Sequence, residues 1–320
     1  KSCSADNFTL TDTATYGTCY TFEITDPLLH FTTRPGPDNG LILELNIEQY
    51  EYLPVSAKAG VKVIVHPVDE YPCPEDGGIL AQPGAVTSVA IRKVITHRLP
   101  SPYSNCVGAG GQGSTQRSLY PDEMYTQKTC MYSCYQMAVY AECECCDIDL
   151  SCDYYKMLNI DKPKKETDLH LPLCNSTDDL NCKSKVEDWF RGSELDCDER
   201  CPPACDRTTF DTVVSQAHWP SDARFDDFVE TLNGSGLLNT SSLDKPSLER
   251  FVRSNYLRLA IFLDSMEFLE FVTQPKYDWN LLLGTIGGLL GLWLGFSLLT
   301  GLEIAEVLID TGVYCIRGRY

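Results

Sequence analysis

The sequence predicts an α+β fold, with a disulfide-rich extracellular domain followed by a transmembrane α-helix. Apolar residues alternate in several segments, as in half-buried strands, whereas other segments have the three- and four-residue spacing of helices. The chain contains sixteen cysteines, a number that favours an oxidising compartment. The twenty-four residues from Trp279 to Leu302 carry no charge, and about 20 apolar residues suffice for a helix to cross a bilayer.

Charge and sequons narrow the class of protein. Asp and Glu number 45 against 26 Lys and Arg, and the formal net charge of −19 argues against nucleic acid as a partner. The basic residues Arg317 and Arg319 follow the apolar run and are typical of a cytoplasmic end. We therefore expect the amino-terminal side of the run to lie outside the plasma membrane. Four N-x-[ST] sequons agree with secretion and predict a glycoprotein, with acceptors at Asn7, Asn175, Asn233 and Asn239.

Alternating apolar residues predict strands near both ends of the extracellular part. The pattern covers Leu41–Ile47, Val61–Val65, Val89–Ile91 and Leu257–Leu263. Strands so far apart indicate one sheet interrupted by a large insertion, residues 101–210, which holds twelve of the sixteen cysteines. After the insertion, a helix with a core-facing apolar stripe is predicted from the N-cap Ser221 to Asn233-Gly234.

The cysteine spacing of the insertion predicts a ladder of nested disulfides. The segment Asp122–Cys143 is predicted to be a helix, in which Cys130 and Cys134 share one face. Three later cysteines repeat the four-residue step, so two antiparallel stripes can be cross-linked. The expected pairs are Cys134–Cys197, Cys130–Cys201, Cys106–Cys205, Cys143–Cys182, Cys145–Cys174 and Cys146–Cys152.

No pattern in the chain indicates an enzyme. The five histidines are scattered, and no H-E-x-x-H, G-x-S-x-G or Walker motif is present. A zinc site at Cys143-Glu144-Cys145-Cys146 is the alternative to disulfides there, disfavoured because the usual second C-x₂-C pair is absent. We predict no catalytic residue, no bound metal and no cofactor.

The apolar run has features that a simple anchor does not need. Ser297 and Thr300 lie deep in it, and Glu303 and Glu306 follow at its cytoplasmic end, where ionisable groups mark ion pathways. One hypothesis is a single-pass cysteine-rich receptor or adhesion protein; the other is an oligomeric channel, since one helix cannot enclose a pore. Glycines spaced along one face allow close packing of helices in either case, namely Gly284, Gly287, Gly288, Gly291 and Gly295.

Several motifs together resemble the DEG/ENaC channels, which include epithelial sodium channels, acid-sensing channels and peptide-gated channels. The motifs are Cys3-Ser4-Ala5-Asp6, Tyr16-Gly17-Thr18-Cys19-Tyr20-Thr21-Phe22, Gly60-Val61-Lys62-Val63-Ile64-Val65-His66 with Asp69-Glu70, Pro83-Gly84, the cysteine ladder, Trp219-Pro220-Ser221, and the stretch from Leu283-Gly284 to Leu302-Glu303. The whole chain looks like the latter two-thirds of a subunit. A first transmembrane helix is then expected upstream of Lys1, together with the partners of Cys3, Cys19 and Cys73, whereas Cys315 is expected in the cytoplasm.

The resemblance implies a homo- or heterotrimer whose subunits each supply two transmembrane helices. Palm, β-ball and finger strands are then expected in residues 1–100, and a cysteine-rich helical thumb in 101–210. A knuckle helix and return palm strands would occupy 211–275, the second, pore-lining helix 276–310, and the cytoplasmic end 311–320. Implied partners are the permeant sodium ion and an extracellular peptide ligand.

The resemblance also implies roles for particular residues. Gly295, Phe296 and Ser297 correspond to the selectivity filter, where the helix gives way to extended backbone; Phe296 is bulkier than the usual Ala or Ser. Glu303 and Glu306 correspond to acidic rings below the filter. Tyr103 corresponds to an aromatic residue that couples thumb movement to the pore. Amiloride, a blocker of the family, is expected at the outer pore, at Gly284, Gly287 and Gly288.

The gating stimulus is a further expectation. Asp69-Glu70 is similar to the proton-gated members, but Ala260 replaces a carboxylate of their acidic pocket. The stretch from Thr87-Ser88 to Arg92-Lys93 is closer to epithelial and peptide-gated members. Between these we favour an FMRFamide-type, neuropeptide-gated channel, because a cationic ligand suits so acidic an ectodomain. A constitutively active epithelial-type channel and a proton-gated channel are the alternatives.

Overall fold

The computed structural model divides into two compact units, one ending at Val272 and one beginning at Thr273. The structure describes residues 7–13, 16–22, 34–54, 56–75, 77–108, 118–120, 123–150, 152, 172–236, 244–295 and 297–317. Of the residues assigned roles above, Cys3, Asp122, Asn239, Phe296 and Arg319 lie outside these ranges. The first unit mixes strands and helices, which confirms the predicted α+β class.

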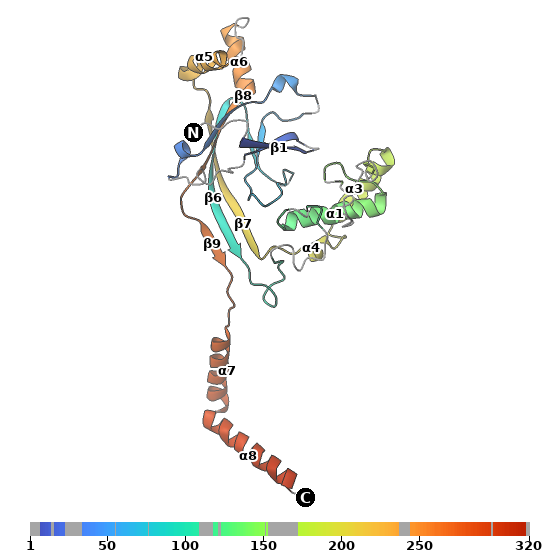
Figure 1. The fold of residues 1–320 in the computed structure, drawn as a ribbon, viewed down its shortest axis with the longest axis vertical. Coiled ribbons are helices and arrows are strands. Elements are labelled where there is room, and N and C mark those ends of the chain that lie inside the picture. The colour runs from blue at the N-terminus through green and yellow to red at the C-terminus, as the bar shows by residue number, and fades with distance from the viewer. Residues whose placement is uncertain are drawn as a thin grey trace. The chain divides into compact units, whose positions relative to one another are not determined.

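A five-stranded sheet organises the first unit (Figure 1). Its path runs β3 (Leu41–Asn46), β8 (Tyr256–Leu263), β6 (Ala85–His97) and β7 (Asp206–His218), and β9 (Leu269–Val272) also pairs with β6. The pairs β3/β8 and β6/β7 are antiparallel, whereas β8 and β9 run parallel to β6. Strands from both ends of the unit thus meet in one sheet, as the sequence predicts.

The register of β6 and β7 brings the two ends of the insertion together. Ala85 pairs with His218 and His97 with Asp206, so the two strands are matched along their whole length. The insertion therefore leaves the sheet after His97 and returns at Asp206, so it covers residues 98–205, a few residues earlier at each end than the expected range 101–210. A disulfide between the segment after His97 and the segment before Asp206 therefore lies close to the end of the sheet.

The core of the sheet comes from the alternating apolar residues. Val89 and Leu257 are completely buried, and Val63, Ala81 and Leu259 join them. Val63 and Ala81 belong to a small sheet of β4 (Val61–Val63) and β5 (Ile79–Ala81). A separate hairpin of β1 (Phe8–Thr13) and β2 (Gly17–Phe22) lies earlier in the chain.

The insertion is helical. It contains α1 (Gln127–Cys143), α3 (Thr177–Arg191) and the single turn α4 (Cys197–Arg200). Helix α1 begins at Gln127 and not at Asp122, because Thr126 caps it: the Thr126 side chain accepts a hydrogen bond from the Thr129 amide. Helix α3, absent from the sequence prediction, has a capping box of its own at Ser176 and Asp179.

Two short helices follow β7. The predicted helix after Ser221 starts as a 3-10 turn, Asp222–Arg224, and continues as α5 (Phe225–Gly234), which ends at Gly234 as expected. Ser221 occupies the N-cap position, but its side chain forms no capping hydrogen bond. Helix α6 (Lys245–Asn255) lies beside α5 (Figure 1), and the two share a buried apolar cluster that includes Phe228 and Val252.

The second unit contains two helices where the hydropathy of the sequence predicts one. Helix α7 spans Trp279–Leu294 and α8 spans Leu298–Arg317, with Gly295 at the C-cap of α7. Among the described residues, none of the helices is both long enough and apolar enough to cross a membrane. The transmembrane helix expected at 276–310 stays a prediction.

Candidate functional site

The link between α7 and α8 contains the expected filter residues. Gly295 has a left-handed backbone (φ 61°, ψ 21°), which glycine adopts without strain, and its amide donates to the Leu290 carbonyl. Ser297 directly precedes α8. Its carbonyl accepts a hydrogen bond from Gly301 over 3.1 Å, and its hydroxyl accepts one from the Thr300 amide over 3.3 Å. Gly295 and Ser297 therefore lie where the helix is interrupted; Phe296 is outside the described residues.

Helix α7 leaves its glycine face uncovered within one chain. A Cβ atom added at Gly284, Gly287 or Gly288 would meet no heavy atom within 4 Å. Large apolar side chains are equally uncovered, and Leu292 and Trp293 are each 79% exposed. Exposed apolar surface on this scale marks contact with lipid or with another protein. The first turn is fixed by Asp278, whose carboxylate accepts a hydrogen bond from the Leu281 amide over 2.7 Å.

Helix α8 carries a line of acidic side chains. Glu303 and Glu306 are exposed, and Asp310, also exposed, follows seven residues after Glu303. Positions i, i+3 and i+7 lie on one face of a helix. Asp310 therefore belongs to the same acidic face, and its seven-residue spacing from Glu303 is the signal that the sequence prediction left unused.

Six disulfides hold the helical insertion together within the described residues. They join Cys106–Cys205, Cys130–Cys201, Cys134–Cys197, Cys143–Cys182, Cys145–Cys174 and Cys146–Cys152, the same six pairs that the cysteine spacing suggests. Every cysteine of the alternative zinc motif is thus bonded to sulfur. Cys19 and Cys315 are thiols in the described part of the chain.

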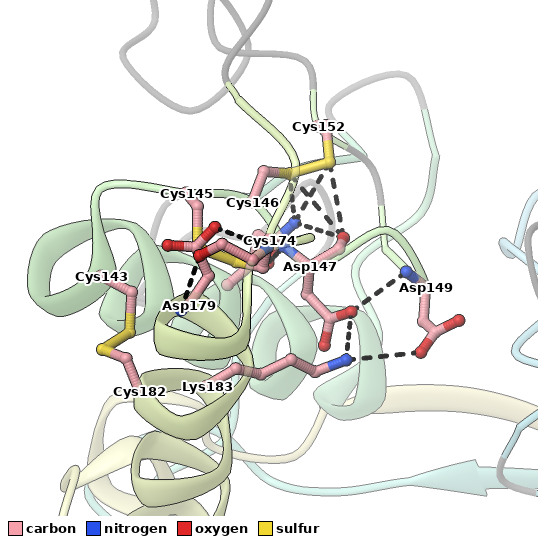
Figure 2. Close-up of a disulfide and its surroundings, with 12 residues drawn as sticks. Cys143, Cys145, Cys146, Asp147, Asp149, Cys152, Cys174, Asp179, Cys182 and Lys183 are labelled. Carbon is pink, nitrogen blue, oxygen red and sulfur yellow. Dashed lines mark hydrogen bonds and ion pairs between the residues drawn. A yellow bond between two sulfur atoms is a disulfide. The ribbon is translucent and has the colours of Figure 1, made fainter.

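A buried ion pair supports this disulfide cluster (Figure 2). Lys183 of α3 donates to the Asp147 carboxylate over 2.7 Å and lies 3.6 Å from Asp149. The Tyr135 hydroxyl of α1 also donates to Asp147, over 3.1 Å. Partial burial acts to lower the pKa of Lys183, but the hydrogen bond and the negative charge of Asp147 outweigh it and raise the pKa. The segment directly after α1, residues 144–150, is therefore held by charge as well as by disulfides.

Tyr103 projects from a loop whose end at Val107 is tied to the segment before β7. The Cys205 amide donates to the Val107 carbonyl over 2.8 Å, and the Val107 amide donates to Pro203 over 2.9 Å. The Cys106–Cys205 disulfide reinforces this junction. The Tyr103 ring is 60% exposed, so the loop presents an aromatic side chain for contact. Its coupling role stays a prediction.

The acidic pair Asp69-Glu70 lies where the loop after β4 meets the segment before α1. The Met124 amide donates to the Asp69 carbonyl over 2.6 Å. Burial raises the pKa of Glu70, an effect that Arg207, His66 and Lys128 oppose. Ala260 is buried in β8, where it pairs with Ile42 and Ser88.

Three predicted glycosylation sites lie in the described residues. Asn7 is half-buried at the start of β1, whereas Asn175 and Asn233 are exposed, directly before α3 and in the last turn of α5. Their modification stays a prediction.

Comparison with known proteins shows the family of the chain and bears on the two hypotheses from the sequence. The family described as amiloride-sensitive sodium channel matches residues 1–307. The chain belongs to this family. Membership confirms the resemblance to DEG/ENaC channels and favours the channel hypothesis over the receptor or adhesion alternative.

Several members of the amiloride-sensitive sodium channel family are similar over almost the whole chain. Epithelial sodium channel subunit alpha of Cavia porcellus is 30% identical, covering 96% of this chain and 42% of its own length. Subunit gamma-2 of Xenopus laevis is 30% identical, covering 100% of this chain and 45% of its own length. Epithelial sodium channel subunit alpha of Homo sapiens is 27% identical, covering 97% of this chain and 43% of its own length. The chain thus spans less than half the length of these relatives.

Proposed function

We propose that this chain carries the pore of a sodium channel subunit, which works in the plasma membrane as a homo- or heterotrimer. Membership of the amiloride-sensitive sodium channel family supports this proposal. The observation that carries it is the non-helical link at Gly295 and Ser297, between the uncharged helix α7 and the acidic helix α8. Carbonyl and hydroxyl oxygens at such a link replace part of the hydration shell of a sodium ion.

In this proposal, each part of the second unit has a role in permeation. Gly295, Phe296 and Ser297 of three subunits form the selectivity filter. Glu303 and Glu306 form negative rings below it, which raise the local concentration of cations. The outer pore, where amiloride binds, is lined by Gly284, Gly287 and Gly288. The glycine face of α7, uncovered in one chain, then packs against neighbouring subunits.

Substitution of the filter residues tests this assignment. The full subunit is expressed in oocytes, and the reversal potential is measured with external sodium or potassium. Gly295→Ala and Ser297→Ala should change the permeability ratio of sodium to potassium. Gly312→Ala is the matched control, because Gly312 is equally open but lies far along α8. Unchanged ratios in both filter variants would contradict the filter assignment.

Two gating modes have support. The named relatives are epithelial sodium channel subunits, which supports a channel that conducts without a ligand. A neuropeptide-gated channel is the second candidate, because the net charge of −19 would attract a cationic peptide and speed its association. In either mode Tyr103 transmits movement of the disulfide-bonded insertion to the pore.

Current recordings separate these modes. The full subunit is examined at neutral pH without ligand, with amidated arginine-containing peptides, and at about pH 5 as the acid stimulus. Standing current identifies the epithelial type, peptide-evoked current the peptide-gated type, and acid-evoked current the proton-gated type. Tyr103→Ala should reduce opening in any mode. Tyr20→Ala, at a similarly exposed tyrosine of β2, should not.

A further inference from the structure

Two hydroxyl groups meet at the start of α8. The Ser297 Oγ and Thr300 Oγ1 atoms lie 3.1 Å apart, within hydrogen-bond distance. Ser297 is exposed, whereas Thr300 is half-buried. Ser297 is thus the more exposed residue of the pair.

The direction of this hydrogen bond decides whether the Ser297 hydroxyl keeps a free lone pair. A serine hydroxyl has one proton to donate and two lone pairs to accept with. The Thr300 amide already occupies one lone pair, over 3.3 Å. If Ser297 donates its proton to Thr300 Oγ1, the second lone pair stays free. If Thr300 donates instead, both lone pairs are occupied, and the serine proton points away from the pair.

Only the first arrangement suits contact with a cation, because a lone pair attracts it and a proton repels it. We propose that Thr300 is a positioning residue: its Oγ1 accepts the proton of Ser297 and keeps a lone pair of Ser297 Oγ available to the permeating sodium ion. This inference rests on the proposed role of Ser297 in the filter. It adds to that role the residue that sets the orientation of the serine hydroxyl.

The side chain of threonine suits this task. Its branched Cβ restricts rotation about χ1, and in a helix the hydroxyl bonds to groups three or four residues earlier. Here the partner three residues earlier is the Ser297 hydroxyl. Valine has nearly the same shape but cannot accept the proton, and serine keeps the hydroxyl while losing the branch. The two substitutions therefore separate hydrogen bonding from packing.

The test measures ion selectivity in the full subunit expressed in oocytes. Thr300→Val should lower the sodium-to-potassium permeability ratio by about three- to tenfold, the size expected from losing one hydrogen bond. Thr300→Ser should keep the ratio within about twofold, since the accepting oxygen remains. Thr311→Val is the matched control on the same helix. The Thr311 hydroxyl donates to the Val307 carbonyl over 2.6 Å and makes no contact with the filter, so the ratio should not change.

The outcomes distinguish this inference from the proposed function. A normal ratio in Thr300→Val beside an altered ratio in Ser297→Ala would overturn the role of Thr300 and leave the filter assignment standing. Absence of any sodium current in the unmodified subunit would instead contradict the proposed function. If Thr300→Val does not reach the cell surface, Thr300→Ala replaces it. Failure of both variants at the surface, with normal Thr300→Ser, would mean that Thr300 serves folding and not selectivity.

Discussion

Lys183 and Asp147 form a hydrogen-bonded ion pair that joins the middle of α3 to the loop after α1, with 2.7 Å between Nζ and Oδ1. The Asp147 side chain is only 5% exposed and that of Lys183 20%. The Gln136 side chain adds two hydrogen bonds to the Asp147 backbone, each over 3.1 Å. The segment after α1 that carries Cys145 and Cys146, half-cystines of two different disulfides, is therefore fixed by a polar network as well.

Removing the lysine should destabilise the insertion. Lys183→Met leaves the Asp147 carboxylate buried without its cation, and breaking a buried pair in this way costs about 3 kcal/mol. Thermal unfolding of the purified protein measures the loss. Lys185→Met is the matched control, because Lys185 is exposed on the same helix. The double variant Lys183→Met, Asp147→Leu should be more stable than Lys183→Met alone; equal or lower stability would show that the charges are not coupled.

Neighbouring rungs of the disulfide ladder should depend on each other. Cys130–Cys201 and Cys134–Cys197 span 71 and 63 residues, but with one rung in place the other closes a ring of only a few residues. By loop entropy, replacing one pair with alanine should cost about 3 kcal/mol and replacing both about 7 kcal/mol. Denaturant unfolding of the three variants provides the comparison. A double loss equal to twice the single loss would contradict this coupling.

Glu70 should make stability depend on pH in the acid range. Burial raises its pKa in the folded chain, so the native state binds the proton more tightly than the unfolded chain does. Stability is then highest below the unfolded pKa and falls as pH rises through the raised native pKa. Glu70→Gln, which mimics the protonated form, should be more stable than the natural protein at neutral pH, and the difference should vanish in acid.

Melting temperatures measured from acid to neutral pH test this prediction. Glu75→Gln is the control, since Glu75 is exposed in the same loop. A Glu70→Gln variant that is less stable at neutral pH would show that the basic neighbours outweigh burial.

The acidic face of α8 should control conductance. Glu303→Gln, Glu306→Gln and Asp310→Asn each remove a negative charge, which lowers the concentration of cations near the pore. Single-channel sodium conductance should fall in each variant, and more strongly at low ionic strength, where screening is weak. Asp310→Glu keeps the charge and should conduct normally. A fall in Glu303→Gln without one in Asp310→Asn would exclude Asp310 from the conduction path.

Much of the fold can be predicted from two patterns in the sequence, the cysteine spacing and the alternation of apolar residues in the strands. Disulfides need close and specific backbone geometry, so the matching four-residue steps in two segments restrict the pairs that can form. Alternation in Leu41–Asn46 likewise matches the alternately half-buried and exposed residues of that strand. In Tyr256–Leu263 residues on both faces are buried or half-buried, so burial there does not follow the alternation. These patterns are local, so they can be recognised in the sequence without knowledge of the tertiary structure.

Other elements have only a weak pattern of apolar residues in the sequence, because burial of an apolar face is not what holds them in place. Helix α3 has one buried residue, Val186, since disulfides and Lys183 hold it in place. Strand β7 is exposed on both faces along most of its length, so its sequence has no reason to alternate. The interruption at Gly295 is invisible to hydropathy because the residues on both sides are equally apolar, although the family resemblance implies it. The ion pair of Lys183 joins residues 36 positions apart, and the spacing of residues within one helix or strand cannot predict such a contact.

The current carried by the full subunit in oocytes, recorded with and without amiloride, tests the proposed sodium channel most directly. We expect an inward current that reverses near the sodium equilibrium potential, follows that potential when external sodium is lowered, and disappears with amiloride. The recording is made without ligand, then with peptide, and then in acid. A surface-expressed subunit that carries no amiloride-sensitive sodium current under any of these conditions, alone or with related subunits, would contradict the account.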